Sequence, residues 1–234
     1  MEKYQMLKSI VLAGVVLAIS GGVALADDGI FPQPSPDGWG GFYMGLNGVY
    51  AKGKATDRGV TFPDISLMGD MVGGQTGYNF VLVDGVVAGI QTDLDWSAEQ
   101  GSYGDGTTTV IGTFNTATLT DKINWTGAAT AHVGVYVGPV MAYALGGITV
   151  AGNTLHNLGT DQLQGHSPIE AEVDQTQVGW TAGGGVAAKV GPFSGFLEYR
   201  YSDYGTGNYN AAVGAEPVRV TDQQVRVGLN YYKQ

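Results

Sequence analysis

The spacing of its turns constrains this chain more than any other feature of its sequence. Three tight turns, at Val83-Asp84-Gly85, Gly138-Pro139 and Gly191-Pro192, each join two segments of about ten residues in which apolar and polar side chains alternate. Long polar stretches separate these pairs of segments, near Thr56, Tyr103, Leu158 and Asn208. Short turns on one side and long loops on the other are typical of a transmembrane β-barrel.

The beginning of the chain predicts a secretory signal peptide over residues 1–26. Lys3 and Lys8 form a basic start, residues 10–19 are mostly apolar, and Ala24-Leu25-Ala26 matches the small-x-small cleavage pattern. An uncleaved anchor is the alternative, but the apolar run is short of the ~20 residues that a spanning helix needs. We therefore expect cleavage after Ala26, followed by a proline-rich periplasmic lead-in over residues 27–40.

Composition limits what the remaining chain, residues 41–234, can be. Charged residues make up only 14% of the chain, yet no apolar run after residue 26 approaches the length of a membrane helix. Because every backbone polar group in hydrocarbon must be bonded internally, a membrane domain without such helices has to be a closed β-barrel. The net charge of −10 argues against a nucleic-acid partner, and the absence of Cys excludes disulfides, thiol catalysis and thiolate metal sites.

Alternation with a period of two predicts an all-β domain, an eight-stranded antiparallel transmembrane β-barrel. In the clearest segment Ile90 and Leu94 lie on one face and Asp93 and Asp95 on the other, whereas the segment from Val140 is apolar on both faces and its register stays open. An even number of strands places both chain ends on the periplasmic side. The expected strands are residues 41–54, 71–82, 86–99, 121–137, 140–151, 176–190, 193–204 and 220–233.

Aromatic residues fall at the two ends of these strands, where the membrane meets water. The expected outer girdle consists of Trp96, Trp125 and Trp180. The expected inner girdle consists of Phe42, Phe80, Tyr136, Phe193 and Tyr231.

Five segments carry a family resemblance. They are residues 41–48 (GFYMGLNG), 93–96 (DLDW), 179–186 (GWTAGGGV), 197–205 (LEYRYSDYG) and 225–231 (VRVGLNY). In these segments the chain resembles the porin-like outer-membrane proteins of alphaproteobacteria, relatives of the opacity-type surface proteins. The resemblance implies a surface antigen in the outer membrane of a Gram-negative bacterium, in contact with membrane lipid and recognised by the outer-membrane assembly machinery.

Charged residues on the inward faces predict a network in the lumen. Its expected members are Asp93, Asp95, His132, Lys189, Glu198, Arg200 and Arg226. The interior of an eight-stranded barrel is just wide enough for side chains, so these charges have to pair with one another or keep water. A narrow ion path and a glycosidase-like carboxylate pair, Asp93 with Asp95, are the alternative interpretations.

The longest outer loop contains His156 and His166, ten residues apart. Exposed polar residues are the simpler interpretation, and haem capture is the functional one, because imidazole is a common metal ligand and some members of the resembling family bind haem. Ser167 beside His166 and Ser202 beside Asp203 have no catalytic signature around them. We therefore predict no catalytic residues, no metal site and no firm cofactor.

The sequence as a whole predicts a non-enzymatic barrel with a structural or surface-antigen, porin-like role. Its outer loops are expected to contact a host or surface ligand. Haem capture by these loops is the first alternative, and a narrow channel for small solutes is the second. A wide pore is not expected, because channel-forming porins use about sixteen or more strands.

Overall fold

A computed structural model describes residues 38–57, 65–97, 100–103, 107–110, 113–161, 169–211 and 214–233. Every regular element in these residues is a β-strand. No helix in this part of the chain is long and apolar enough to cross a membrane. The expected signal peptide and most of the expected lead-in lie outside the described residues and stay predictions.

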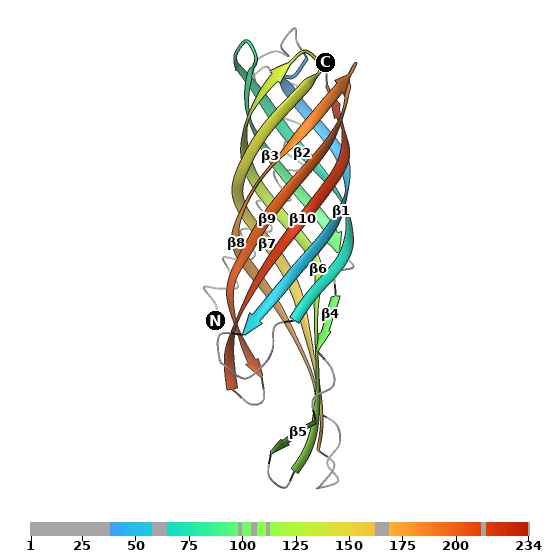
Figure 1. The fold of residues 1–234 in the computed structure, drawn as a ribbon, viewed down its shortest axis with the longest axis vertical. Coiled ribbons are helices and arrows are strands. Elements are labelled where there is room, and N and C mark those ends of the chain that lie inside the picture. Colours follow the sequence, from blue (N-terminus) through green and yellow to red (C-terminus); the bar gives the residue numbers. More distant parts are fainter. Residues whose placement is uncertain are drawn as a thin grey trace.

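The strands form one closed antiparallel barrel (Figure 1). The first strand, β1, pairs with both β2 and the last strand, β10, so the sheet has no open edge along the barrel wall. Eight long strands close the barrel, which confirms the predicted fold, and the short strands β4 and β5 pair with β6 at one end. The strands are β1 Gly41–Asp57, β2 Ile65–Val83, β3 Val86–Ser97, β4 Gln100–Tyr103, β5 Thr107–Val110, β6 Thr113–Val137, β7 Val140–Asp161, β8 Ile169–Val190, β9 Phe193–Ala211 and β10 Gly214–Tyr232.

The three predicted tight turns all lie at one end of the barrel, drawn at the top of Figure 1. Gly85, Gly138 and Gly191 have φ values of 81°, 57° and 59° there, a conformation that glycine adopts without a steric cost. This end is the periplasmic end, because short turns face the periplasm in outer-membrane barrels.

At the opposite end the strands run further than their sequence predicted. Pairing between β6 and β7 continues to Asn115 and Asp161, and pairing between β9 and β10 continues to Ala211 and Gly214. The strands expected to end at residues 121, 151, 204 and 220 were therefore too short at this end. Backbone pairing continues at this end through residues that are mostly polar, because backbone hydrogen bonds between strands do not depend on side-chain polarity.

The apolar face of each strand points outward. Leu46, Val72 and Leu229 are 73%, 65% and 65% exposed, whereas the inward Arg200 and Arg226 are 2% and 1% exposed. Apolar side chains outside and charged ones inside suit a barrel that has lipid as its solvent.

The register of β7, which the sequence left open, follows from burial. Met141, Leu145 and Thr149 are buried and point into the lumen, whereas Ala142 and Ala144 are exposed on the outside. Between Met141 and Thr149, the odd-numbered residues of this strand therefore face inward.

Three buried apolar clusters line the lumen at different heights. The largest lies within a few residues of the periplasmic turns and includes Trp39, Tyr43 and Tyr136. A second, with Ile123 and Tyr204 among its members, lies toward the outer end. The third cluster consists of Val49, Ala51 and Met71. Polar and charged side chains fill the space between the periplasmic and outer clusters.

Candidate functional site

Three strands bring five charged side chains together in the middle of the lumen. Asp93 and Asp95 come from β3, Glu198 and Arg200 from β9, and Arg226 from β10. On β3 and on β9 the two charged residues are two positions apart, so both side chains of each strand point into the lumen. All five side chains are at most 2% exposed.

These five residues form what we call the lumen ion-pair network. Arg200 donates through Nη1 to Asp93 Oδ2 at 2.8 Å and through Nε to Glu198 Oε1. Arg226 donates through Nη1 to Asp95 Oδ2 at 2.6 Å, and its Nη2 lies 3.4 Å from Asp93 Oδ1. Its Nε lies 3.6 Å from Glu198 Oε1, so each arginine bridges carboxylates on different strands.

Neutral side chains supply further hydrogen bonds to the network. Tyr143 on β7 donates through its hydroxyl to Glu198 Oε2 at 2.8 Å. On β10, Gln224 accepts a hydrogen bond from Arg226 Nη1 at 3.4 Å and donates to Asp222 Oδ2 at 2.7 Å. Buried charges are tolerated only when paired and hydrogen-bonded, and this set of contacts meets that condition for all three carboxylates.

Two predicted members of the network lie elsewhere in the lumen. His132 Nε2 forms a hydrogen bond of 2.9 Å with Asn79 Oδ1, and its ring lies beside the Tyr143 ring. Lys189 lies at the periplasmic end, where its Nζ is 3.8 Å from the centroid of the Tyr232 ring. Neither residue forms an ion pair with the five charged residues, because each lies closer to the periplasmic turns.

A tryptophan that the sequence placed in the lead-in closes the periplasmic end of the lumen. Trp39 is fully buried, its Nε1 donates to the Gly138 carbonyl at 3.2 Å, and its own carbonyl accepts from Asn79 Nδ2 at 3.0 Å. The edge of its indole meets the Tyr232 ring at 89°, with 6.2 Å between centroids. We call Trp39, Tyr136 and Tyr232, with the Lys189 ammonium over two of their rings, the periplasmic plug.

The role of Trp39 was not predicted, whereas the inward face of Tyr136 follows the alternation of its strand as expected. Tyr136 lies at the inner end as expected, but it is 7% exposed and packs against Trp39 inside the lumen, so it does not belong to the lipid-facing girdle. It lies four residues from the inward His132 on the same strand, so the alternation that predicts an inward His132 also predicts an inward Tyr136, and only its place in the lipid-facing girdle was wrong.

The other girdle aromatics have outward parity on their strands. The exposed ones are Trp96, Trp180, Phe193 and Tyr231, and the half-buried ones are Phe42, Phe80 and Trp125. Phe193 and Tyr231 lie beside each other, with 5.4 Å between their ring centroids. Aromatic rings at this level anchor a barrel at the membrane interface.

The space left between the plug and the network is small. A cavity of about 20 Å³ lies there, among Tyr43, His132, Tyr143 and Glu198. Such a volume holds roughly one water molecule. A sugar has no room between Asp93 and Asp95, and both carboxylates are held by arginines, so the glycosidase-like interpretation has no support from this geometry.

The two loop histidines are placed only in part. His156 belongs to β7, where its backbone is the register partner of Thr120 and Glu172. His166 lies outside the described residues, so haem capture by the pair stays a prediction. In the part of the chain that is described, no three His, Asp or Glu side chains are grouped to hold a metal ion.

Comparison with known proteins identifies the family. Residues 15–232 match the family model described as an outer membrane protein beta-barrel domain. The chain belongs to this outer-membrane β-barrel family.

Similar family members come from alphaproteobacteria, as the sequence resemblance implied. The chain is 30% identical to a 31 kDa outer-membrane immunogenic protein of Brucella melitensis, covering 96% of this chain and 99% of that protein. It is 32% identical to a 25 kDa outer-membrane immunogenic protein of Brucella abortus, with 96% and 98% covered. Among solved structures, Neisserial surface protein A is 17% identical, with a TM-score of 0.42 over 82% of this chain and 97% of that one. The protein is thus located in the outer membrane.

Proposed function

We propose that this outer-membrane β-barrel is a non-enzymatic, non-conducting structural barrel that holds extended hairpins at the cell surface. The observation that carries the proposal is that the lumen is filled at two separate heights. The periplasmic plug occupies one level, and the lumen ion-pair network occupies the next. A solute would have to displace both, and the second holds buried charges that cannot separate cheaply.

The outer end of the barrel supports a role in surface contact. The strand pairings β6–β7, β7–β8 and β9–β10 continue beyond the barrel wall at that end, where β7–β8 and β9–β10 form hairpins (Figure 1). The two Brucella relatives are named as outer-membrane immunogenic proteins, which supports a role of this family at the cell surface. A rigid barrel with a filled lumen is a suitable base for such hairpins, because strands hold their ends in fixed positions.

Planar-bilayer recording tests the proposal directly. We expect the purified wild-type protein to insert without discrete conductance steps, because the plug and the network both fill the lumen. Trp39→Ala is also expected to show no conductance, because the network still blocks the lumen when the plug is disturbed. This variant therefore tests the network as a barrier separately from the plug. Insertion is verified on the same sample by its unboiled mobility on a gel, so that silence is not failed insertion.

Reproducible single-channel steps from the wild-type protein would contradict the proposal and favour the narrow-channel alternative. Steps from Trp39→Ala alone would show that the plug is the barrier and that the network is permeable. Haem capture by the outer hairpins is the other alternative, and it leaves the conductance unchanged.

A further inference from the structure

A groove lies on the lipid-facing surface of the barrel, across β10, β1, β2 and β3. Its volume is about 810 Å³, and the outward side chains that line it are almost all apolar. This volume lies within the range of about 300–1,000 Å³ that is usual for ligand-binding clefts. Residues that shape it include Leu46, Gly48, Gly74, Leu94, Val227 and Leu229.

The groove exists because two outward positions in neighbouring strands are glycines. Gly48 on β1 is the register partner of Val227 and Val72, and Gly74 on β2 is the partner of Leu46. A Cβ atom added to Gly48 would meet no atom within 4 Å, so this glycine is not needed for backbone packing. The missing side chain leaves space for an apolar occupant from the membrane.

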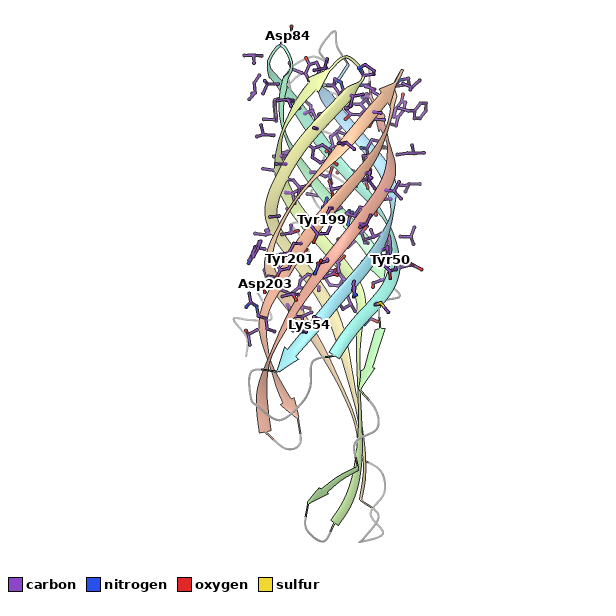
Figure 2. All side chains as sticks on the ribbon, in the orientation of Figure 1. Tyr50, Lys54, Asp84, Tyr199, Tyr201 and Asp203 are labelled. Atoms are coloured by element: carbon purple, nitrogen blue, oxygen red, sulfur yellow. The ribbon has the colours of Figure 1, made fainter. Side chains whose placement is uncertain are left out.

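Two exposed lysines lie beyond the groove on the same face of β1. Lys52 and Lys54 are four and six residues from Gly48, toward the end of the barrel opposite the periplasmic turns. Figure 2 places Tyr50 and Lys54 on β1 toward this end, away from Asp84 in a periplasmic turn. Four strand residues span about 13 Å, roughly half of the ~25 Å apolar band of such barrels. Because strands in such barrels are tilted by ~35–45°, the distance along the membrane normal is shorter, and the lysines lie on the outer-leaflet side of the groove, toward the headgroups.

The lysines are notable in a chain with 21 acidic and only 11 basic residues. Arg219 on β10 lies further toward the outer end, beside β1, and pairs with Asp203 of β9. One exposed acid, Asp70, lies on β2 next to this surface as the register partner of Tyr50. Exposed lysines at headgroup level attract phosphates in the membrane surface, and an acid beside them weakens that attraction.

We propose that the groove and the two lysines together bind one phosphorylated glycolipid of the outer leaflet. An acyl chain lies along Gly48 and Gly74, and a phosphate is held by Lys52 and Lys54. The occupant is a lipid because the groove opens into the hydrocarbon, and the charges above it are complementary to a phosphorylated headgroup. The inference is independent of the proposed function, because it concerns the outer face of the barrel and not the lumen.

Native mass spectrometry of the folded full-length protein in detergent tests this site. Bisphosphorylated lipid A is the probe, and dephosphorylated lipid A and phosphatidylethanolamine are compared with it. We expect one tightly retained lipid A per barrel. The double change Lys52→Gln with Lys54→Gln should weaken retention of the phosphorylated probe by roughly tenfold and leave the dephosphorylated one unchanged.

Two further variants separate the acyl and headgroup parts of the site. Gly48→Leu fills the groove and should reduce binding of lipid A with and without phosphate. Asp70→Asn removes the nearby negative charge and should tighten binding of the phosphorylated probe several-fold. Gly146→Leu is the matched control, because Gly146 is an outward glycine of β7 outside the groove, where an added Cβ makes only ordinary van der Waals contact.

The outcomes that overturn the proposal are distinct. Equal retention by all variants would mean that lipid A binds elsewhere or nonspecifically. Binding that is lost in Gly48→Leu but is insensitive to phosphate and to the lysines would indicate a general acyl-chain contact. A dimer that disappears in Gly48→Leu would assign the groove to a second copy of the chain. A gel shift on heating confirms that each variant is folded before it is compared.

Discussion

Arg226 contacts all three carboxylates of the lumen ion-pair network. It donates to Asp95, lies 3.4 Å from an oxygen of Asp93, and approaches Glu198 at 3.6 Å. Arg200 reaches only two of them, Asp93 and Glu198. A buried charge without its partner is far more costly than an intact pair. Loss of Arg226 would therefore affect three buried carboxylates, whereas loss of Arg200 would affect two.

We expect Arg226→Ala to lower the free energy of unfolding by about 3–5 kcal/mol, because Asp95 would lose its arginine in a buried site. Urea titration of the barrel refolded in lipid vesicles measures the change. The comparison variant is Arg219→Ala, since Arg219 is 40% exposed and its partner Asp203, which is 5% exposed, keeps a hydrogen bond from the Gly205 amide. This variant should shift the unfolding midpoint less, because water reaches the Arg219 side of the pair and Asp203 retains its backbone hydrogen bond. Equal shifts in the two variants would contradict a structural role for the network.

At the scale of the single strand, β7 shows what alternation can and cannot predict. Where charged residues mark one face, as Arg200 and Glu198 do on β9, the period of two assigns both faces correctly. On β7 the inward Met141, Leu145 and outward Ile148 are all apolar, so hydrophobicity gives no contrast between lumen and lipid. The pairing with β6 and β8 decides the register.

This register predicts the accessibility of spin labels, and the absence of Cys from the chain makes single labels unambiguous. A label on Ala144→Cys should collide readily with oxygen dissolved in the bilayer, because this position faces lipid. A label on Leu145→Cys should be immobilised and shielded from oxygen in the lumen. Ala131→Cys on β6, which is also outward and exposed, provides the reference for a lipid-facing position. A reversed pattern would mean that β7 is shifted by one residue.

At the scale of the whole molecule, the β1–β10 seam makes the sheet a closed surface. Its register runs without interruption from Tyr43 and Tyr232 to Asp57 and Val218. We expect the unboiled protein to migrate faster on a denaturing gel than the boiled one, since a closed barrel resists detergent until it is heated. Gel electrophoresis of the outer-membrane fraction with and without boiling measures this, and the boiled sample is the control. Identical mobility would contradict a closed barrel.

The sequence predicted the architecture because the strand period and the turn spacing are local properties. The three short turns and the faces of most strands follow from residues that are near one another in the chain. The pairing inside the lumen does not, because Arg200 and Asp93 are 107 residues apart and Arg226 and Asp95 are 131 apart. Their heights depend on strand tilt and stagger, which no local pattern contains. Trp39 was missed for a related reason: it precedes the first strand and has no alternation to mark it.

The distribution of charge within the lumen ion-pair network has a consequence for assembly. The acidic pair, Asp93 and Asp95, is carried by the N-terminal half of the barrel, whereas both arginines, Arg200 and Arg226, enter with the last two strands. Glu198 also lies on β9, so within this network the N-terminal half carries a formal charge of −2 and the last two strands carry +1 until the wall is complete. The two halves attract across the interior while the barrel is still open, and in a partly inserted chain Asp93 and Asp95 lack the arginine partners that arrive only with the last two strands. Closure is thus favoured by long-range attraction, and stopping short of it is penalised by the lipid itself.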